Sequence, residues 1–376
     1  MNALYITSQN MSDMSSGVNK KILMQASAFT RLGVNVEIPD LSAKTWKDKI
    51  IRRIPFLMNE FEKNLDDFLK KNNLSNIDFV YIRHPMASIQ LLRQMKKIKS
   101  RNIQIVYEFP TFPYDKNSKK LSAKLSLLKD KYARDKLVKY VDVGVDYSGY
   151  SEIFGIPCLC LSNGIDTNAI TPKLVHVRND TIRFIGVALL TDWNGYDRLI
   201  DALAKYIKIF DSPKIEFHIV GNGDVYDKLK RQIERNNLTD IVFMHGFLCG
   251  EDLDRLYNLC DIGVGTLNPS RKYKNHIMSS LKTKEYAAKG MPFIKGDIDD
   301  AFDKNPQDFV YNVKDDESEI DLHAIIQWYI QLLGHYGEEK LALHIRDYAM
   351  RELSWDKQMN SVINCLENRG KHESSL

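Results

Sequence analysis

The sequence of 376 residues contains no long hydrophobic run. None of its apolar stretches approaches the roughly 18 residues needed to span a bilayer, and the start, MNALYITSQN, lacks the basic and apolar regions of a signal peptide. The five cysteines form no C-x-x-C pair. This absence argues against a disulfide framework or a structural zinc site and fits a reducing cytoplasm.

The net charge of +4 is small, but it is unevenly distributed. Residues 1–170 hold 26 Lys and Arg against 17 Asp and Glu, whereas the remainder holds 27 against 32. We therefore expect an anionic partner to face the first half. Nucleic acid is one such partner, but the sequence has no helix-turn-helix, RNP-like or zinc-finger signature, so we expect no nucleic acid to bind.

Strand-like and helical stretches alternate along the whole chain, which is typical of parallel sheets covered by helices. One series runs from ALYIT to PCLCLSNGID, and a second begins at IRFIGVA. We predict an α/β protein with a Rossmann-like domain over residues 1–170 and a second over residues 171–350. Residues 351–376 are expected to form a terminal helix that returns to the first domain, by analogy with other two-domain chains.

Glycines follow three of the predicted strands. Gly17 opens a helix in SSGVNKKIL. Close backbone approach and the free N–H groups of the helix start would suit a bound anion, but an ordinary turn between strand and helix is about equally well indicated. Gly221 lies in HIVGNG, which lacks the third glycine of a dinucleotide fingerprint, so a tight turn is slightly favoured over a ligand contact. In MHGFLCG, Phe247 and Leu248 leave the predicted sheet toward the same edge, where the base of a nucleotide could bind.

The stretch SSLKTKEYAAKGMPFI predicts a short helix that ends at Gly290 and leads into a strand. Ser279 and Ser280 are candidate caps. Lys282 and Lys284 in the first turn oppose the helix dipole, which indicates an anion nearby. A solvated surface would explain Lys284, but it explains Lys282 less well.

Glu108 ends an apolar strand in YEFPTFPYD. An acid at the end of an interior strand is costly unless it binds something. The two interpretations have comparable weight: a residue that contacts a ligand, or a buried structural carboxylate paired with Arg83.

Two basic stretches are amphipathic. KTWKDKIIRRIPF carries Trp46 among cations, and residues 117–140 hold eight basic and two acidic residues beside a row of leucines. Such helices can lie on anionic lipid. A charge-rich solvated helix is slightly favoured for either stretch alone, but two of them in one basic half favour a membrane surface.

Taken together, these stretches resemble the retaining GT-B glycosyltransferases of the "glycosyltransferases group 1" family, and more closely its members from bacterial surface-polysaccharide clusters. The resemblance rests on SSGVNKKIL, EFPTFPYD, LSNGID, IGVALLTDWNGYDRLI, HIVGNG, HGFLCGEDLDRLY and SSLKTKEYAAKGMPFI, and covers nearly the whole chain. It implies two Rossmann-like domains facing across a cleft. The second would hold a nucleotide-sugar donor and the first an acceptor, with no metal and no cofactor.

The resemblance also implies roles for individual residues. Glu285 matches the second acid of the family motif and is expected to bind the ribose hydroxyls. Arg271 and Lys282 would offset the diphosphate charge. The remaining donor-binding positions are expected to be Gly17 over the diphosphate, Gly221 and Asn194 at the sheet edge, Phe247 and Leu248 at the base, and the main chain of Leu281, Lys282 and Thr283 at the sugar and phosphates.

The sequence departs from the family pattern at several positions. Ile277 stands where another glutamate is common, and Val187 and Asn194 stand where an arginine and a lysine are usual. Glu108 stands where many members carry a histidine, so we expect it to contact the sugar or the acceptor in the catalytic site.

The resulting hypothesis is a cytoplasmic hexosyltransferase, peripheral on the inner membrane face. It would transfer a sugar with retention to a lipid-linked saccharide in surface-polysaccharide biosynthesis. The alternatives are a non-catalytic nucleotide-sugar-binding module of the same fold and a GT-B epimerase acting on a free nucleotide sugar.

Overall fold

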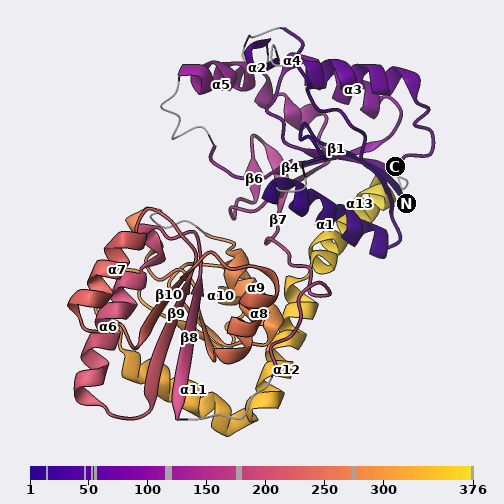
Figure 1. The fold of residues 1–376 in the computed structure, drawn as a ribbon. Helices are drawn as coiled ribbons and strands as arrows, with labels where there is room; N and C mark the ends of the chain where they lie inside the picture. Colours follow the sequence, from indigo (N-terminus) through magenta and orange to yellow (C-terminus); the bar gives the residue numbers. More distant parts are fainter. Residues whose placement is uncertain are drawn as a thin grey trace. The chain divides into compact units, whose positions relative to one another are not determined.

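The computed structural model describes residues 1–13, 16–45, 48–51, 54, 57–114, 121–174, 180–272 and 277–373. Trp46, which the sequence placed in a basic amphipathic stretch, lies outside these residues. The chain forms two compact units, Met1–Ser162 with Trp355–Leu376, and Asn163–Ser354 (Figure 1). Among the described residues, no helix is long and apolar enough to cross a membrane.

The first unit is built on a seven-stranded sheet in the order β2-β1-β3-β4-β5-β7-β6. Its strands pair in parallel, except for the antiparallel pair of β6 and β7. The strands are β1 Asn2–Ile6, β2 Asn35–Glu37, β3 Phe79–Arg83, β4 Gln104–Phe109, β5 Val143–Asp146, β6 Glu152–Ile153 and β7 Ile156–Cys160.

Helices cover both faces of this sheet, because alternate strand residues point to opposite sides. Leu4 and Ile6 of β1 pack with α3, α4 and part of α5, whereas Ala3 and Tyr5 pack with α1 and α13. The terminal helix α13 lies beside α1 (Figure 1). The helices are α1 Gly17–Arg31, α2 Asp48–Ile51, α3 Glu60–Lys71, α4 Ile89–Lys99, α5 Leu121–Arg134 and α13 Trp355–Glu373.

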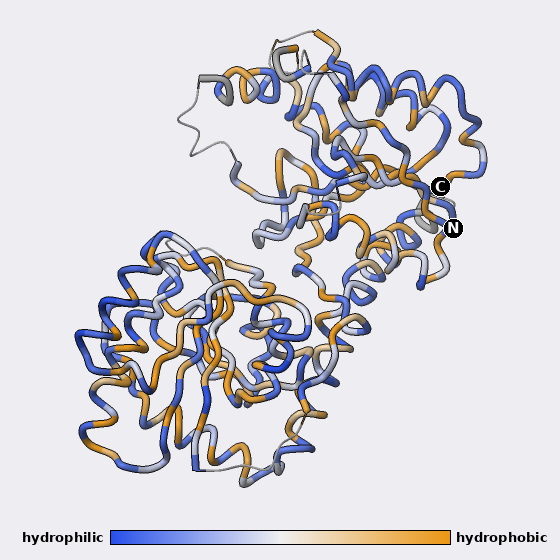
Figure 2. The backbone as a smooth tube through the Cα atoms, viewed as in Figure 1, coloured by the Kyte–Doolittle hydropathy of each residue, from blue (hydrophilic) through white to orange (hydrophobic). Residues whose placement is uncertain are grey.

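The second unit is built on a six-stranded parallel sheet in the order β10-β9-β8-β11-β12-β13. In Figure 2 the strands of both sheets are largely hydrophobic, whereas hydrophilic residues follow outer helices such as α3 and α7. The strands are β8 Thr181–Val187, β9 Lys214–Val220, β10 Val242–Gly246, β11 Ile262–Val264, β12 Phe293–Lys295 and β13 Val310–Asn312.

Helices also cover both faces of the second sheet. Phe184 of β8 packs in a cluster with α6, α7 and α11, whereas its neighbour Ile185 packs with α8, α9, α10 and α12. The helices are α6 Tyr196–Ile209, α7 Tyr226–Arg235, α8 Gly250–Leu259, α9 Leu281–Lys289, α10 Asp300–Asp303, α11 Leu322–Tyr336 and α12 Glu338–Tyr348. The predicted α/β class with two parallel-sheet domains is confirmed.

Two tyrosines fix the first turn of α6 and the middle of α9 against the sheet. A Cβ atom at Gly186 would lie 2.7 Å from the Tyr196 ring, and one at Gly263 would lie 2.5 Å from the Tyr286 ring. Both hydroxyls donate to the carbonyl oxygen of Val264, at 3.4 Å and 3.1 Å. These glycines therefore let the two helices approach the sheet closely.

Candidate functional site

The carboxyl edge of the second sheet gathers most of the predicted site residues. All six strands are parallel, so their carboxyl ends meet at one edge, where α/β folds bind ligands. Gly221 follows β9, Phe247 follows β10, and Asp297 follows β12 across Gly296. Helix α9 begins at the same edge, after the loop that leaves β11.

Helix α9 has the predicted extent and an unusual beginning. It ends at Gly290, whose φ of 76° is the left-handed conformation that favours glycine. Ser280 is the N-cap residue, but its side chain makes no capping hydrogen bond, and the first turn contains no acidic residue. Leu281 is exposed, whereas Thr283 is buried. The first turn of α9 itself therefore contributes no acid to offset the positive end of the helix dipole.

Lys284 is not a surface residue, so its interpretation as part of a solvated face was wrong. The side chain is fully buried, and Nζ donates to Asp299 Oδ2 at 2.7 Å, Ser279 Oγ at 3.0 Å and the Ser280 carbonyl oxygen at 3.2 Å. An ammonium group has three N–H donors, and all three are used. Lys284 therefore anchors the helix start to the Asp299 loop.

Lys282 is the opposite case. Its Nζ atom is buried but has no hydrogen-bond partner in the part of the chain that the structure describes. It lies 5.7 Å from the centroid of the Tyr196 ring. Burial lowers the pKa of Lys282 to about 8, and the Asp297 charge acts in the opposite direction. The beginning of α9 thus holds one cation with its hydrogen-bonding capacity unused.

Glu285 lies one turn further along α9 and is half-buried. Burial raises its pKa, whereas the Lys289 charge and the Tyr257 hydroxyl act to lower it. A half-buried carboxylate at this point can still accept hydrogen bonds from hydroxyl groups. The predicted ribose contact is compatible with this position and stays a prediction.

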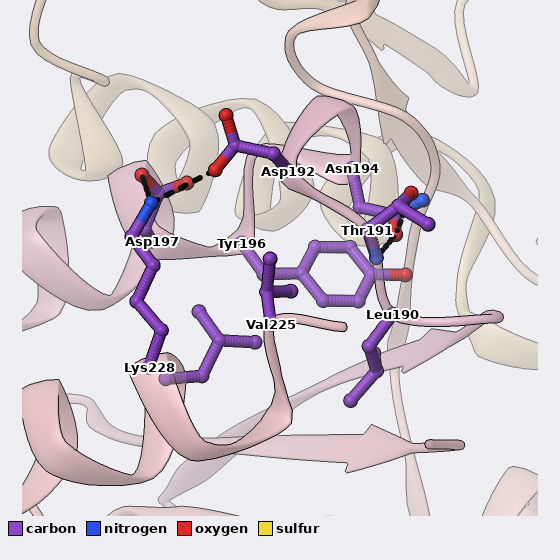
Figure 3. Close-up of a pocket in the computed structure, with 9 residues that line it drawn as sticks. Leu190, Thr191, Asp192, Asn194, Tyr196, Asp197, Val225 and Lys228 are labelled. Atoms are coloured by element: carbon purple, nitrogen blue, oxygen red, sulfur yellow. Dashed lines mark hydrogen bonds and ion pairs between the residues drawn. The ribbon is translucent and has the colours of Figure 1, made fainter. Parts of the chain in front are cut away.

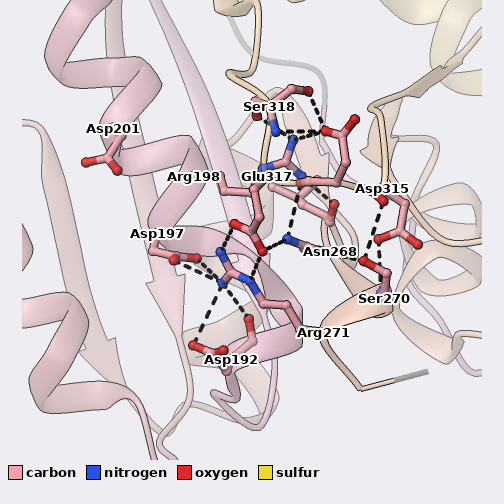
Figure 4. Close-up of polar contacts among 12 residues, drawn as sticks. Asp192, Asp197, Arg198, Asp201, Asn268, Ser270, Arg271, Asp315, Glu317 and Ser318 are labelled. Carbon is pink, nitrogen blue, oxygen red and sulfur yellow. Dashed lines mark hydrogen bonds and ion pairs between the residues drawn. The ribbon is translucent and has the colours of Figure 1, made fainter. Parts of the chain in front are cut away.

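Arg271, the second predicted phosphate donor, is already bound to carboxylates (Figure 4). Its Nε and Nη2 atoms donate to the two carboxylate oxygens of Glu317 at 2.8 Å and 2.7 Å, and Nη1 donates to Asp197 at 2.8 Å. These contacts raise the pKa of Arg271, with the Glu317 bond as the largest cause. Two carboxylates therefore already offset the charge that a phosphate would meet at this guanidinium.

Asn194 also has a structural role. It ends the short 3-10 turn Asp192–Asn194, and its Oδ1 accepts from the N–H and hydroxyl groups of Thr191 at 2.8 Å and 3.0 Å. Figure 3 shows this pair beside Tyr196 in a crevice at the sheet edge. The crevice is lined by Leu190, Thr191, Asp192, Asn194, Tyr196, Asp197, Val225, Lys228 and Leu229.

Gly221 lies where the backbone conformation itself requires a glycine. Its φ is 124°, and a Cβ atom there would lie 1.8 Å from the carbonyl oxygen of Ala188. Phe247, which follows the neighbouring edge strand β10, is 73% exposed, and Leu248 packs partly against the core. An exposed aromatic ring at this edge is compatible with the predicted base contact.

In the first unit, Gly17 is the first residue of α1, and a Cβ atom there would meet open space. Glu108 is fully buried at the end of β4. Its carboxylate is bound by Arg83 and accepts from the Tyr81 hydroxyl at 2.6 Å and Gln25 Nε2 at 2.9 Å. These contacts match the structural alternative, a buried acid paired with Arg83.

Asp297 was not among the predicted site residues. Its carboxylate is buried just after an interior strand, which is the same signal that pointed to Glu108. In the sequence, the acid-rich segment KGDIDD after MPFI carries this signal.

Comparison with known proteins identifies related folds. A family model described as "Glycosyl transferases group 1" matches residues 179–327. No curated protein matches the sequence. A structure of a glycosyltransferase from Rickettsia africae is similar, with 17% identity, a TM-score of 0.64 and 98% of each chain covered.

Two further structures cover nearly the whole chain. Anabaena Alr3699/HepE in complex with UDP is 13% identical with a TM-score of 0.57, and covers 100% of this chain and 99% of that one. Sucrose-phosphate synthase from Thermosynechococcus elongatus is 12% identical with a TM-score of 0.60, and 99% of each chain is covered. The chain therefore has the GT-B fold of these proteins, and its residues 179–327 match the glycosyl transferases group 1 family model.

Proposed function

We propose that the protein transfers a sugar from a nucleotide-diphosphate donor to a saccharide acceptor. The observation that carries this proposal is the desolvated ammonium of Lys282 at the N-terminus of α9, which has no hydrogen-bond partner among the residues that the structure describes. A helix N-terminus and a buried cation together bind a diphosphate strongly, because both interact with it where water is excluded. The family match and the UDP complex of the similar Anabaena protein support the same donor class.

The same arrangement can promote the reaction. When the bond between the sugar and the diphosphate breaks, negative charge grows on the leaving oxygen. Lys282 and the main-chain N–H groups of the first turn of α9 would stabilise that charge. A front-face reaction with retention needs no protein nucleophile, because a leaving phosphate oxygen can take the proton of the acceptor hydroxyl. No metal or cofactor is required in this scheme.

A binding and turnover panel tests the proposal. The purified protein is titrated with UDP-, GDP- and other nucleotide sugars, and release of the nucleoside diphosphate is then measured with saccharide acceptors. We expect at least one nucleotide sugar to bind and to be consumed. If none binds, the proposal is wrong.

A non-catalytic module of the same fold is the second candidate. It is favoured by Asn194 and Arg271, because both are occupied by bonds within the protein. Such a module would bind a nucleotide sugar without turnover under any acceptor condition. A GT-B epimerase would instead convert the nucleotide sugar in the absence of any acceptor. The acceptor-free arm therefore identifies an epimerase, and the arm with acceptor separates a transferase from a module.

We further propose that the acceptor is lipid-linked, as in surface-polysaccharide biosynthesis, and that the first unit binds the cytoplasmic face of the inner membrane. Helix α5 exposes Leu125, Leu128 and Tyr132, which are 41%, 58% and 57% exposed. Their spacing places them on one helical face, beside the lysines of the same helix. One of these, Lys129, does not contribute, because it is buried against Glu62 at 3.3 Å.

Replacing Leu125, Leu128 and Tyr132 together by serine is expected to weaken binding to anionic phosphatidylglycerol vesicles about tenfold or more. Co-sedimentation at low salt measures this binding. The matched control replaces Ile209 and Leu343 of the second unit, which are 72% and 58% exposed, by serine. If both variants lost vesicle binding equally, or if the unaltered protein bound no vesicles, the proposed membrane-binding surface on α5 would be contradicted.

A further inference from the structure

The carboxylate of Asp297 lies beside Ile277, the position at which the family motif commonly has a glutamate. Ile277, where the glutamate is common, forms an isolated parallel bridge with Ile298, and the Met278 N–H donates to the Ile298 carbonyl oxygen at 2.7 Å. Asp297 immediately precedes Ile298. The loop after β12 therefore brings an acid alongside the segment in which the sequence has lost one.

The carboxylate of Asp297 is buried with its hydrogen-bonding capacity unused among the described residues. The residue is 3% exposed, and neither oxygen of its carboxylate has a hydrogen-bond partner among the described residues. A buried carboxylate is normally hydrogen-bonded or paired, because its desolvation is otherwise costly. An exception of this kind is a candidate for a functional role, since a ligand can supply the missing partners.

The neighbouring lysines that the structure describes bind groups other than the Asp297 carboxylate. Lys284 donates to Asp299, and Lys295 donates to both oxygens of Asp303 at 2.8 Å. Lys295 also contacts Asp297, but through the main-chain carbonyl oxygen at 2.7 Å. Lys282 is near enough for its charge to act on Asp297, yet the two form no ion pair. Within the described part of the chain, an acid and a cation that both lack hydrogen-bond partners thus lie near the beginning of α9.

We infer that Asp297 accepts hydrogen bonds from hydroxyl groups of the donor sugar, while Lys282 binds the diphosphate. This inference rests on the proposed function and deepens it. The two carboxylate oxygens can accept from hydroxyls on neighbouring carbons of a hexose ring. A donor sugar that lacks the contacted hydroxyl would leave the buried carboxylate without a hydrogen bond, and such a ligand would bind more weakly. Asp297 therefore selects against sugars that are deoxygenated at the contacted carbon.

The test separates the sugar from the nucleotide. Calorimetric titrations compare a nucleoside diphosphate with its nucleotide sugar, using the pair that the unaltered protein binds. In Asp297→Asn and Asp297→Ala, affinity for the nucleotide sugar should fall about tenfold or more, because a charge-assisted hydrogen bond is lost. Affinity for the nucleoside diphosphate should stay within about threefold.

Asp300→Asn is the matched control, because it removes a carboxylate three residues away that pairs with Lys304 on the surface. It should change neither affinity. Thermal unfolding of each variant shows that the fold is kept. Equal weakening of both ligands in the Asp297 variants would overturn the inference, and so would unchanged affinity for the sugar nucleotide. If the unaltered protein binds no nucleotide sugar, the proposed function itself fails, which is a distinct result.

Discussion

Replacing Lys282 by methionine is expected to weaken binding of the nucleoside diphosphate about 30-fold or more. The reason is that a buried, charge-assisted contact to phosphate contributes about 2–3 kcal/mol. Methionine keeps the length and apolar character of the side chain but removes the ammonium. Calorimetric titration measures the affinity, and turnover of the nucleotide sugar should fall at least as far, since the same cation stabilises the leaving group.

The stability of this variant distinguishes a functional lysine from a structural one. Lys282 Nζ makes no hydrogen bond within the described chain, so its removal breaks none. The melting temperature should therefore stay level or rise. Lys314→Met, which removes an exposed lysine of the same unit, is the control and should leave affinity unchanged. A large loss of stability with unchanged affinity would contradict the role of Lys282 at the phosphates.

The pH dependence of binding provides a second readout for Lys282. Its pKa in the free protein is about 8, lowered by burial. Only the protonated form carries the charge that attracts the diphosphate, so affinity should fall as the pH rises through 8, by about tenfold at pH 9. Titrations between pH 7 and pH 9 should show this decline in the unaltered protein and not in Lys282→Met. If Lys282→Met showed the same fall in affinity, another titrating group would be its cause.

The sequence predicted the elements of this fold well because their signals are local. The limits of α9 follow from its apolar stripe and from Gly290, and the two α/β series follow from alternating strands and helices. The first turn of α9 was harder, since two lysines separated by one residue look alike in a sequence. What distinguishes Lys284 is its contact with Asp299, fifteen positions later in the sequence. Asp299 reaches Lys284 because of the turn that follows β12.

The predicted phosphate donors illustrate the same limit. In the sequence, Arg271 and Lys282 are alike as cations near a helix start, and chemistry alone cannot rank them. In the folded unit Arg271 meets Asp197, 74 positions before it, and Glu317, 46 positions after it, whereas Lys282 meets no acid at bonding distance among the described residues. Pairings across such separations depend on sheet order and loop paths, which no local pattern contains.

Lys284→Met is expected to reduce the free energy of unfolding by about 3–5 kcal/mol, because breaking a buried ion pair leaves the partner charge without compensation. The Asp299 carboxylate is 1% exposed and, among the described residues, would keep only the hydrogen bond that it accepts from the Ala301 N–H group. Ser279 Oγ and the Ser280 carbonyl oxygen would lose their donor as well. Urea unfolding of the variant measures the change.

A double-mutant cycle then assigns the loss to the pair. Lys284→Met combined with Asp299→Asn removes both charges, so the double variant should be less destabilised than the sum of the two single variants by about 1.5 kcal/mol or more. Additive losses would show that the two groups act independently. Lys282→Met should lose ligand binding without losing stability, whereas Lys284→Met should lose stability. The two variants are therefore expected to give opposite results. The same substitution two residues apart thus tests both the ligand at the beginning of α9 and the ion pair that holds the helix there.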